Sequence, residues 1–312
     1  MSDGKSVHYD PIVVGGESTV VAEYVPDKTN ASAHQSEAEL ENEFIRLLES
    51  QAYEYLNITS EEELIGNLRE QLERLNGISF SESEWKQFFS AQIASSNEGI
   101  AEKTRRIQED HVQLLHRDDG STKNVALLDK TNIHNNHLQV INQYEVSEGE
   151  GGAKRSNRYD VTVLVNGLPM VHIELKRRGV DLREAFNQIN RYQRDSFWAG
   201  SGLFEYVQLF VISNGTLTKY YSNTIRQQRL DESKQSATKS KTSHSYEFTS
   251  WWADANNKPI QDLTAFAKTF FAKHSLLNVL TKYCVFTVEE MLLVMRPYQI
   301  VATERILQRI DI

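Results

Sequence analysis

Three residues near the middle of the chain have the chemistry of a metal-dependent hydrolytic site. Asp160 lies in the strand-like run YDVTVLV, and Glu174 and Lys176 lie in the run PMVHIELK at 169–176. Because side chains alternate along a strand, Glu174 and Lys176 share one face. Two carboxylates suit a hard cation such as Mg²⁺, which polarises a phosphoryl oxygen and lowers the pKa of bound water. A lysine beside them can offset negative charge in the transition state, so the pattern predicts phosphodiester hydrolysis.

The turn between the two runs decides whether Asp160 reaches Glu174. The dipeptide at 166–167, Asn-Gly, favours a hairpin. Residues that face each other across an antiparallel pair lie on the same side of the sheet. The numbers of facing residues have the same sum along a regular pair, so Asp160 can face Glu174 only in a register where that sum is even. A regular two-residue turn gives an odd sum and places Asp160 opposite Leu175. We therefore expect a three-residue loop at 166–168, or a β-bulge.

A Glu-x-Lys tripeptide alone usually marks a solvated strand face, so its surroundings carry the argument. Asp160 interrupts an otherwise apolar strand, and residues 181–195 follow with a helical pattern. Gln188 and Tyr192 lie four residues apart on one face of this helix, beside an apolar stripe. They either belong to the site or simply cover the edge of the core.

The elements that must position these residues follow from periodicity. Ser36 and Glu39 form a capping signal before an apolar helical stripe, and further helices are expected at 61–75, 82–94, 98–105 and 260–280. Strands are expected at 124–129, 138–145, 205–213 and 217–221. The expected fold is α/β, a mixed central β-sheet flanked by helices and preceded by a helical N-terminal region. The expected divisions are an extended lead-in at 1–35, a catalytic domain at 36–259 with a flexible loop at 225–247, and, at 260–312, a linker helix and the truncated start of a second domain.

Composition limits the class of protein. The chain has 312 residues and a net charge of −9, and Cys284 is its only cysteine, so no intrachain disulfide is possible. No apolar run is long enough for a membrane span, and we expect a cytoplasmic protein. A protein that simply coats nucleic acid would be basic. Basic residues are nevertheless concentrated at 154–194, so a local anion-binding face is expected there.

These motifs together resemble the PD-(D/E)XK nuclease superfamily, whose fold is restriction-endonuclease-like. The stretch at 158–197 resembles the N-terminal endonuclease domain of the HsdR subunit of type I restriction–modification enzymes. Similar segments occur near 36–56 and at 292–307, so the resemblance covers nearly the whole chain. One departure is Tyr159, which stands where the superfamily name has proline.

The resemblance assigns roles to particular residues. It implies that Asp160 and Glu174 bind Mg²⁺ and that Lys176 is the catalytic lysine. It also implies that Gln188 and Tyr192 form the family's Q-x-x-x-Y motif. The further metal ligands that it implies are the main-chain carbonyl of Leu175 and an acid of the first helix, either Glu37 or Glu41.

The resemblance also implies a larger machine. RPYQ, ending at Gln299, resembles the adenine-recognising motif of superfamily 2 helicases, but the sequence has no G-x-x-x-x-G-K-[ST] loop for ATP phosphates. The expected function is Mg²⁺-dependent cleavage of double-stranded DNA, coupled in the full subunit to ATP-driven translocation, with methyltransferase and specificity subunits as partners. This chain alone is expected to cut weakly or not at all. The alternatives are a non-catalytic docking and coupling module of the same complex, or a stand-alone nuclease of the same fold.

Overall fold

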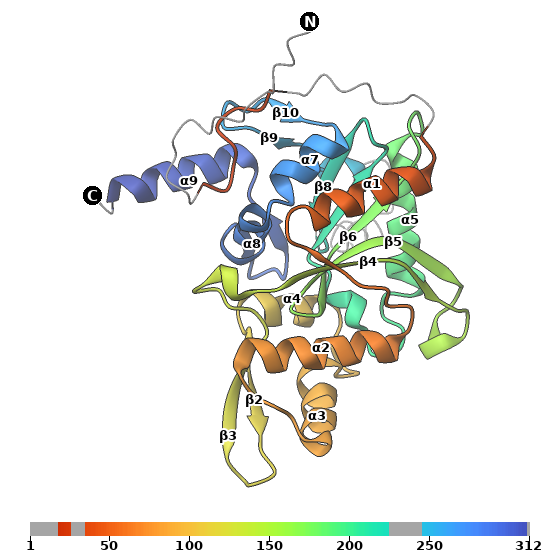
Figure 1. Cartoon of the computed structure of the whole chain (residues 1–312), viewed down its shortest axis with the longest axis vertical. Coiled ribbons are helices and arrows are strands. Elements are labelled where there is room, and N and C mark those ends of the chain that lie inside the picture. Colours follow the sequence, from red (N-terminus) through yellow and green to blue (C-terminus); the bar gives the residue numbers. More distant parts are fainter. Residues whose placement is uncertain (1–17, 26–34, 225–244, 311–312) are drawn as a thin grey trace, which may run out of the picture.

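A central six-stranded sheet organises the chain (Figure 1). The computed structural model describes residues 18–25, 35–224 and 245–310. The sheet has the order β1-β4-β5-β6-β7-β8. Its strands are β1 (Glu54–Tyr55), β4 (Leu138–Val146), β5 (Asn157–Val165), β6 (Leu168–Leu175), β7 (Leu209–Ser213) and β8 (Thr218–Ser222). The β1–β4 and β6–β7 pairs are parallel and the other pairs antiparallel, which confirms the expected mixed sheet.

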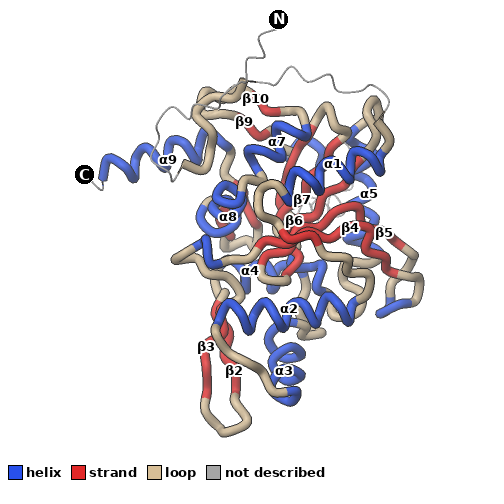
Figure 2. Tube along the Cα trace, viewed as in Figure 1, coloured by secondary structure: helices blue, strands red, loops and turns tan. Residues whose placement is uncertain are grey.

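Helices surround the sheet (Figure 2). The helices that pack around it are α1 (Glu37–Glu49), α2 (Glu61–Asn76), α4 (Ile100–Gln108), α5 (Leu182–Asp195), α7 (Leu263–Phe270) and α8 (Lys273–Lys282). Every residue of β6 and β7 is buried. Strands covered on both sides read as nearly continuous apolar runs, so a polar side chain within them has an unusual environment.

The first helix begins as its sequence indicates. The Ser36 hydroxyl accepts from the Glu39 N–H at 3.2 Å, and the Glu39 carboxylate accepts from the Ser36 N–H at 2.8 Å. This capping box satisfies two backbone donors that the helix itself leaves without partners. Leu40, Phe44 and Leu48 then bury one stripe of α1 in the core, and this fixes which of its acidic residues face the sheet.

Two segments that were each predicted to form one continuous helix are divided in the structure. Residues 82–94 form α3 (Glu82–Phe88) followed by a π-helical turn, and the single helix expected at 260–280 is divided into α7 and α8. The break lies at Phe271 and Ala272, where Ala272 is extended. It allows the Phe271 ring to pack edge-on against Phe44, 5.4 Å between centroids, while Phe270 packs against Trp252 at 5.1 Å. Tertiary aromatic packing therefore overrides the local helical pattern.

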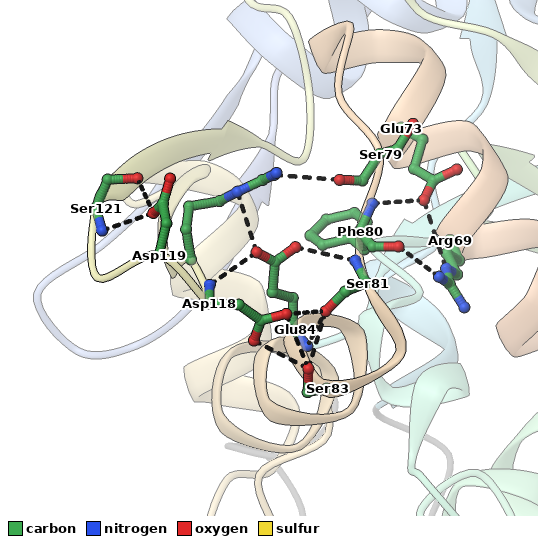
Figure 3. A network of polar contacts seen from close by, with 11 residues as sticks. Arg69, Glu73, Ser79, Phe80, Ser81, Ser83, Glu84, Asp118, Asp119 and Ser121 are labelled. Carbon is green, nitrogen blue, oxygen red and sulfur yellow. Dashed lines mark hydrogen bonds and ion pairs between the residues drawn. The ribbon is translucent and has the colours of Figure 1, made fainter.

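A hairpin of β2 (Val112–His116) and β3 (Thr122–Ala126) projects from the body (Figure 1), and β2 was not predicted from the sequence. A polar network attaches its turn to the start of α3 (Figure 3). The buried Glu84 carboxylate accepts from the N–H groups of Ser81 and Asp118, and the Arg117 Nε lies 3.1 Å from it. The Asp118 carboxylate in turn accepts from the Ser81 and Ser83 hydroxyls.

The chain ends with small elements outside the main sheet. They are β9 (Trp252–Ala253), β10 (Pro259–Ile260), β11 (Cys284–Phe286), β12 (Leu292–Val294) and α9 (Pro297–Ile310). The strand expected at 205–213 begins only at Leu209, after a 3-10 turn at Leu203–Tyr206.

Only parts of two predicted segments can be compared with the structure. Most of the flexible loop at 225–247 lies outside the described residues, as does most of the lead-in at 1–35. The described part of the lead-in is packed, because Val20 is buried and the Thr19 carbonyl accepts from the Ser275 hydroxyl at 2.7 Å. Within the described ranges, no helix is long and apolar enough to cross a membrane.

Candidate functional site

The β5–β6 hairpin combines a tight turn with a β-bulge. The turn is the two-residue Asn-Gly pair at 166–167, and both residues have positive φ, 50° and 81°, as the favoured hairpin turns require. Leu164 pairs with Pro169, but Val163 pairs with Val171, so the register shifts by one residue between them. The three-residue loop was therefore wrong, and the alternative of a β-bulge is confirmed.

Beyond the bulge the numbers of facing residues add to an even number instead of an odd one. This register brings Asp160 to the level of Glu174. Asp160 Oδ2 accepts from the Leu175 N–H at 2.8 Å, which ties the carboxylate to β6. Burial, and then the negative charge of Glu174, raise the pKa of Asp160 to about 7. Burial also raises the pKa of the fully buried Glu174, while the positive charge of Lys176 opposes this. The two carboxylates thus lie together where neither is well solvated.

Lys176 completes this arrangement. Its Nζ donates to Glu174 Oε1 at 3.1 Å and to the main-chain oxygen of Leu175 at 3.0 Å, and little of the side chain is exposed. Burial lowers the pKa of Lys176, but the charges of Glu174 and Asp160 outweigh it and raise that pKa overall. The ammonium group therefore stays charged and partly neutralises the acidic pair.

The donor set fits a hard cation. Glu174 Oε2 is buried and has no hydrogen-bond partner among the described residues, and the His172 Nε2 that lies 3.5 Å from it belongs to a neutral ring. An unpaired buried carboxylate oxygen is costly, and a metal ion would compensate it. No group of three His, Cys, Asp or Glu side chains in the described chain is arranged to hold a metal. A metal ion would therefore be held by Asp160, Glu174 and the Leu175 carbonyl, and water or phosphate oxygens would fill its other coordination positions.

Both candidate acids of α1 lie near this centre, in different places. Glu37 is half exposed, with Oε2 4.0 Å from Lys176 Nζ and Oε1 accepting from the Arg177 N–H. Glu41 is buried, and burial together with a smaller effect of the Asp160 charge raises its pKa. Its two oxygens accept from the amides of Asn142 and Gln143, each at 2.5 Å. Glu41 is thus oriented beside Asp160, whereas Glu37 lies beside the lysine.

Gln143 was not singled out in the sequence. It has a φ of 53° within β4, opposite Asp160 in the register, and its left-handed backbone is uncommon for a non-glycine residue in a strand. The signal was absent from the sequence because no local pattern marks such a residue. Its function in the structure is to hold Glu41.

Gln188 and Tyr192 connect α5 to β5. The Gln188 amide donates to the Tyr192 hydroxyl, which donates to the Arg158 carbonyl oxygen at 2.7 Å. Tyr192 is fully buried, and burial followed by the negative charge of Glu174 raises its pKa. The pair therefore braces the strand that carries Asp160, and among the described residues its hydrogen bonds reach this strand and not the carboxylates.

Alternation along β6 places His172 on the same face as Glu174, which by itself would suit either a position near the site or an ordinary place on the sheet surface. The ring is fully buried among aromatic side chains, and its Nδ1 lies 3.2 Å from the Thr162 hydroxyl. Burial lowers the pKa of His172 to about 4, so the ring is neutral. Helix α5 covers this side of the sheet, which the alternation within β6 alone could not indicate.

Gln299 lies at the start of α9. Its side-chain oxygen accepts from the Arg296 N–H at 2.8 Å, as a residue that caps a helix start would. This contact accounts for the residue within the described chain, and a role toward a nucleotide stays a prediction.

The fold and site define a mixed α/β protein whose central hairpin presents one fully buried carboxylate, one partly buried carboxylate and a lysine. A family model described as "Type I restriction enzyme R protein N terminus" matches residues 34–229. The chain belongs to this family. It is 46% identical over 301 residues to the Type I restriction enzyme EcoprrI endonuclease subunit of Escherichia coli, covering 96% of this chain and 90% of that protein.

More distant relatives carry the same description. The Type I restriction enzyme SauMSSORF170P endonuclease subunit of Staphylococcus aureus (strain MSSA476) is 35% identical over 283 residues, which cover 89% of this chain but 27% of that protein. A putative type I restriction enzyme endonuclease subunit of Methanocaldococcus jannaschii, MjaIXP, is 35% identical over 118 residues, 36% of this chain and 11% of that protein. The chain thus spans about a quarter or less of these two relatives.

Proposed function

We propose that this chain is the endonuclease part of a type I restriction enzyme subunit and hydrolyses phosphodiester bonds in double-stranded DNA with Mg²⁺. One observation carries the proposal. The partly buried Asp160 and the fully buried Glu174 meet at a bulged hairpin, and a charged lysine bridges Glu174 and the Leu175 carbonyl. Such a cluster costs stability unless a cation compensates it, so a binding role explains it better than a structural one.

The residues divide the work according to their positions. Asp160, Glu174 and the Leu175 carbonyl would hold Mg²⁺, which when bound polarises a phosphate oxygen and lowers the pKa of a water. Lys176 supplies positive charge beside the scissile phosphate and orients the attacking water. Gln188 and Tyr192 keep the Asp160 strand in place from α5.

The complete enzyme requires more than this chain. We propose that ATP-driven translocation by the remainder of the subunit precedes cutting, with Gln299 contacting adenine. Methyltransferase and specificity subunits would select the DNA site, which agrees with phosphate contacts that position but do not read sequence. The acidic net charge of −9 fits a cytoplasmic subunit that reaches DNA through partners.

The test uses the complete subunit assembled with its partners. Asp160→Ala, Glu174→Ala and Lys176→Ala should each reduce plasmid cleavage by about 10²-fold or more, while DNA-stimulated ATP hydrolysis continues. Glu184→Gln removes an exposed acid of α5 and should leave both activities unchanged. If cleavage persists in the three site variants, the chain is a coupling module and not the nuclease.

A further inference from the structure

The exposed face of α5 carries positive charge next to the acidic centre. Arg183, Asn187, Arg191 and Arg194 are all exposed and follow one another by three or four residues, so they form one stripe along the helix. In a chain with a net charge of −9, such a stripe is a local exception. Helix α5 lies beside the strands that carry the carboxylates (Figure 1).

Arg191 is held in a defined position. Its Nε donates to the Asn157 side-chain oxygen at 3.2 Å, and its guanidinium lies 5.5 Å from the centroid of the Tyr192 ring. Neither terminal nitrogen has an acceptor or an ion-pair partner in the described part of the chain. A guanidinium fixed at its inner edge with its outer nitrogens free has the form that binds a phosphate through two parallel hydrogen bonds.

Arg158 is the second free guanidinium at this place. It is exposed, adjoins Asn157 in β5, and makes no side-chain hydrogen bond or ion pair with any described residue. Its main-chain oxygen accepts from the Tyr192 hydroxyl, so α5 packs against the strand that carries Arg158.

The two arginines also flank the acidic centre. Burial is the main cause of the raised pKa values of Glu174 and Glu41. The positive charge of Arg191 lowers the pKa of Glu174, and the positive charge of Arg158 lowers the pKa of Glu41, in each case by less than burial raises it. Each guanidinium is therefore within electrostatic reach of one of these carboxylates. Arg194 differs, because Asp195 engages its Nε at 2.8 Å and its Nη2 at 3.0 Å.

We propose that Arg191 and Arg158 bind backbone phosphates of the DNA strand that enters the acidic centre. This rests on the proposed nuclease function, which supplies the DNA. The carboxylates repel phosphate, so two positive charges at the rim would offset the repulsion, and Arg191, which is held by Asn157, would set the strand's position. Contacts of this kind carry no sequence information, as suits a nuclease that relies on other subunits for recognition.

The test measures binding of a fluorescein-labelled DNA duplex to the full chain by anisotropy, with Ca²⁺ in place of Mg²⁺ and KCl varied. Arg191→Ala and Arg158→Ala should each weaken binding about 5- to 10-fold and lower the slope of log affinity against log salt by about one. Arg191→Lys should restore the slope but only part of the affinity, since lysine keeps the charge without the fork. Arg194→Ala is the matched control and should change the slope little.

Two results would overturn the proposal. One is a salt slope in Arg191→Ala and Arg158→Ala equal to that of the parent chain, and the other is no measurable binding by the parent chain at low salt. Circular dichroism melts identify a variant that fails to fold, and Arg191→Lys then supplies the comparison. Because binding is measured without cutting, this outcome is separate from the loss of cleavage in Asp160→Ala that tests the nuclease function.

Discussion

The Lys176 ammonium group lies 3.1 Å from Glu174 Oε1, and it also donates to the Leu175 carbonyl. The Leu175 carbonyl is one of the oxygens proposed to bind Mg²⁺, and Glu174 Oε2, which has no hydrogen-bond partner among the described residues, is another. The ammonium group thus engages an oxygen that the proposed metal ion would need, and Mg²⁺ binding to the Leu175 carbonyl would require that it move.

This relationship separates metal binding from cutting. Lys176→Met removes the competing charge, so Mn²⁺ should bind roughly tenfold more tightly to the variant, about 1.4 kcal/mol. Cleavage by the complete subunit should nevertheless be lost. Titration calorimetry of the full chain measures the affinity. Weaker Mn²⁺ binding by the variant would mean that Lys176 supports the metal site and does not compete for it.

The raised carboxyl pKa values predict how stability depends on pH without metal. Burial and Glu174 raise the pKa of Asp160 from its ordinary 3.8 to about 7, so the folded chain holds a proton that the unfolded chain releases. This contribution is present below about pH 4 and is lost as pH rises toward 7. Asp160→Asn should therefore be more stable than the parent chain in EDTA at pH 8, by roughly 1–3 kcal/mol, and little different at pH 4.

Thermal unfolding followed by circular dichroism measures this difference. Adding Mg²⁺ at pH 8 should raise the melting temperature of the parent chain and leave that of Asp160→Asn nearly unchanged. Equal pH profiles for the two proteins in EDTA would show that Asp160 is solvated in the folded chain and that its pKa is not raised.

The two acids of α1 provide a matched pair. Glu41→Gln should weaken Mn²⁺ binding about tenfold, because Glu41 is buried, oriented by Asn142 and Gln143, and lies beside Asp160. Glu37→Gln, in an exposed residue 4.0 Å from Lys176, should change the affinity less than threefold on the same scale. The reverse order of effects would assign the further metal ligand to Glu37.

Tyr192→Phe isolates one hydrogen bond. The variant keeps the buried ring but loses the bond from its hydroxyl to the Arg158 carbonyl, which braces β5. We expect the free energy of unfolding to fall by about 1 kcal/mol. Cleavage by the complete subunit should fall roughly tenfold, because the strand that carries Asp160 is less well positioned. Phe186→Leu, in the apolar stripe of the same helix, is the control for packing alone. If cleavage by Tyr192→Phe falls no more than cleavage by Phe186→Leu, Tyr192 has only a structural role.

The hairpin network of Figure 3 predicts an effect on stability with none on the site. Glu84→Ala removes the acceptor for two backbone N–H groups and the Arg117 ion pair, and should cost about 2–4 kcal/mol. Ser121→Ala alters only the local turn at Asp119 and should cost less than about 1 kcal/mol. Urea unfolding measures both. Mn²⁺ affinity at low denaturant should stay at the parent value.

The sequence by itself determined which residues could form a site and what secondary structure carries them. Alternation placed Glu174 and Lys176 on one face, and the Asn-Gly turn joined their strand to that of Asp160. The capping signal at Ser36 correctly located the start of α1. These inferences succeeded because each depends on interactions within a few residues, where strand pleat, turn conformation and helix capping follow from residue type.

Only the tertiary structure decided how these parts meet. The sequence left open whether a three-residue loop or a β-bulge brings Asp160 opposite Glu174, and the structure has the bulge, near Met170. The burial of His172 and the contacts of Glu41 depend on α5, α1 and β4 packing against one sheet. The break at Phe271 depends on an aromatic partner, Phe44, far away in the sequence. No local pattern encodes such contacts, because their free energy arises from surfaces that only the folded chain brings together.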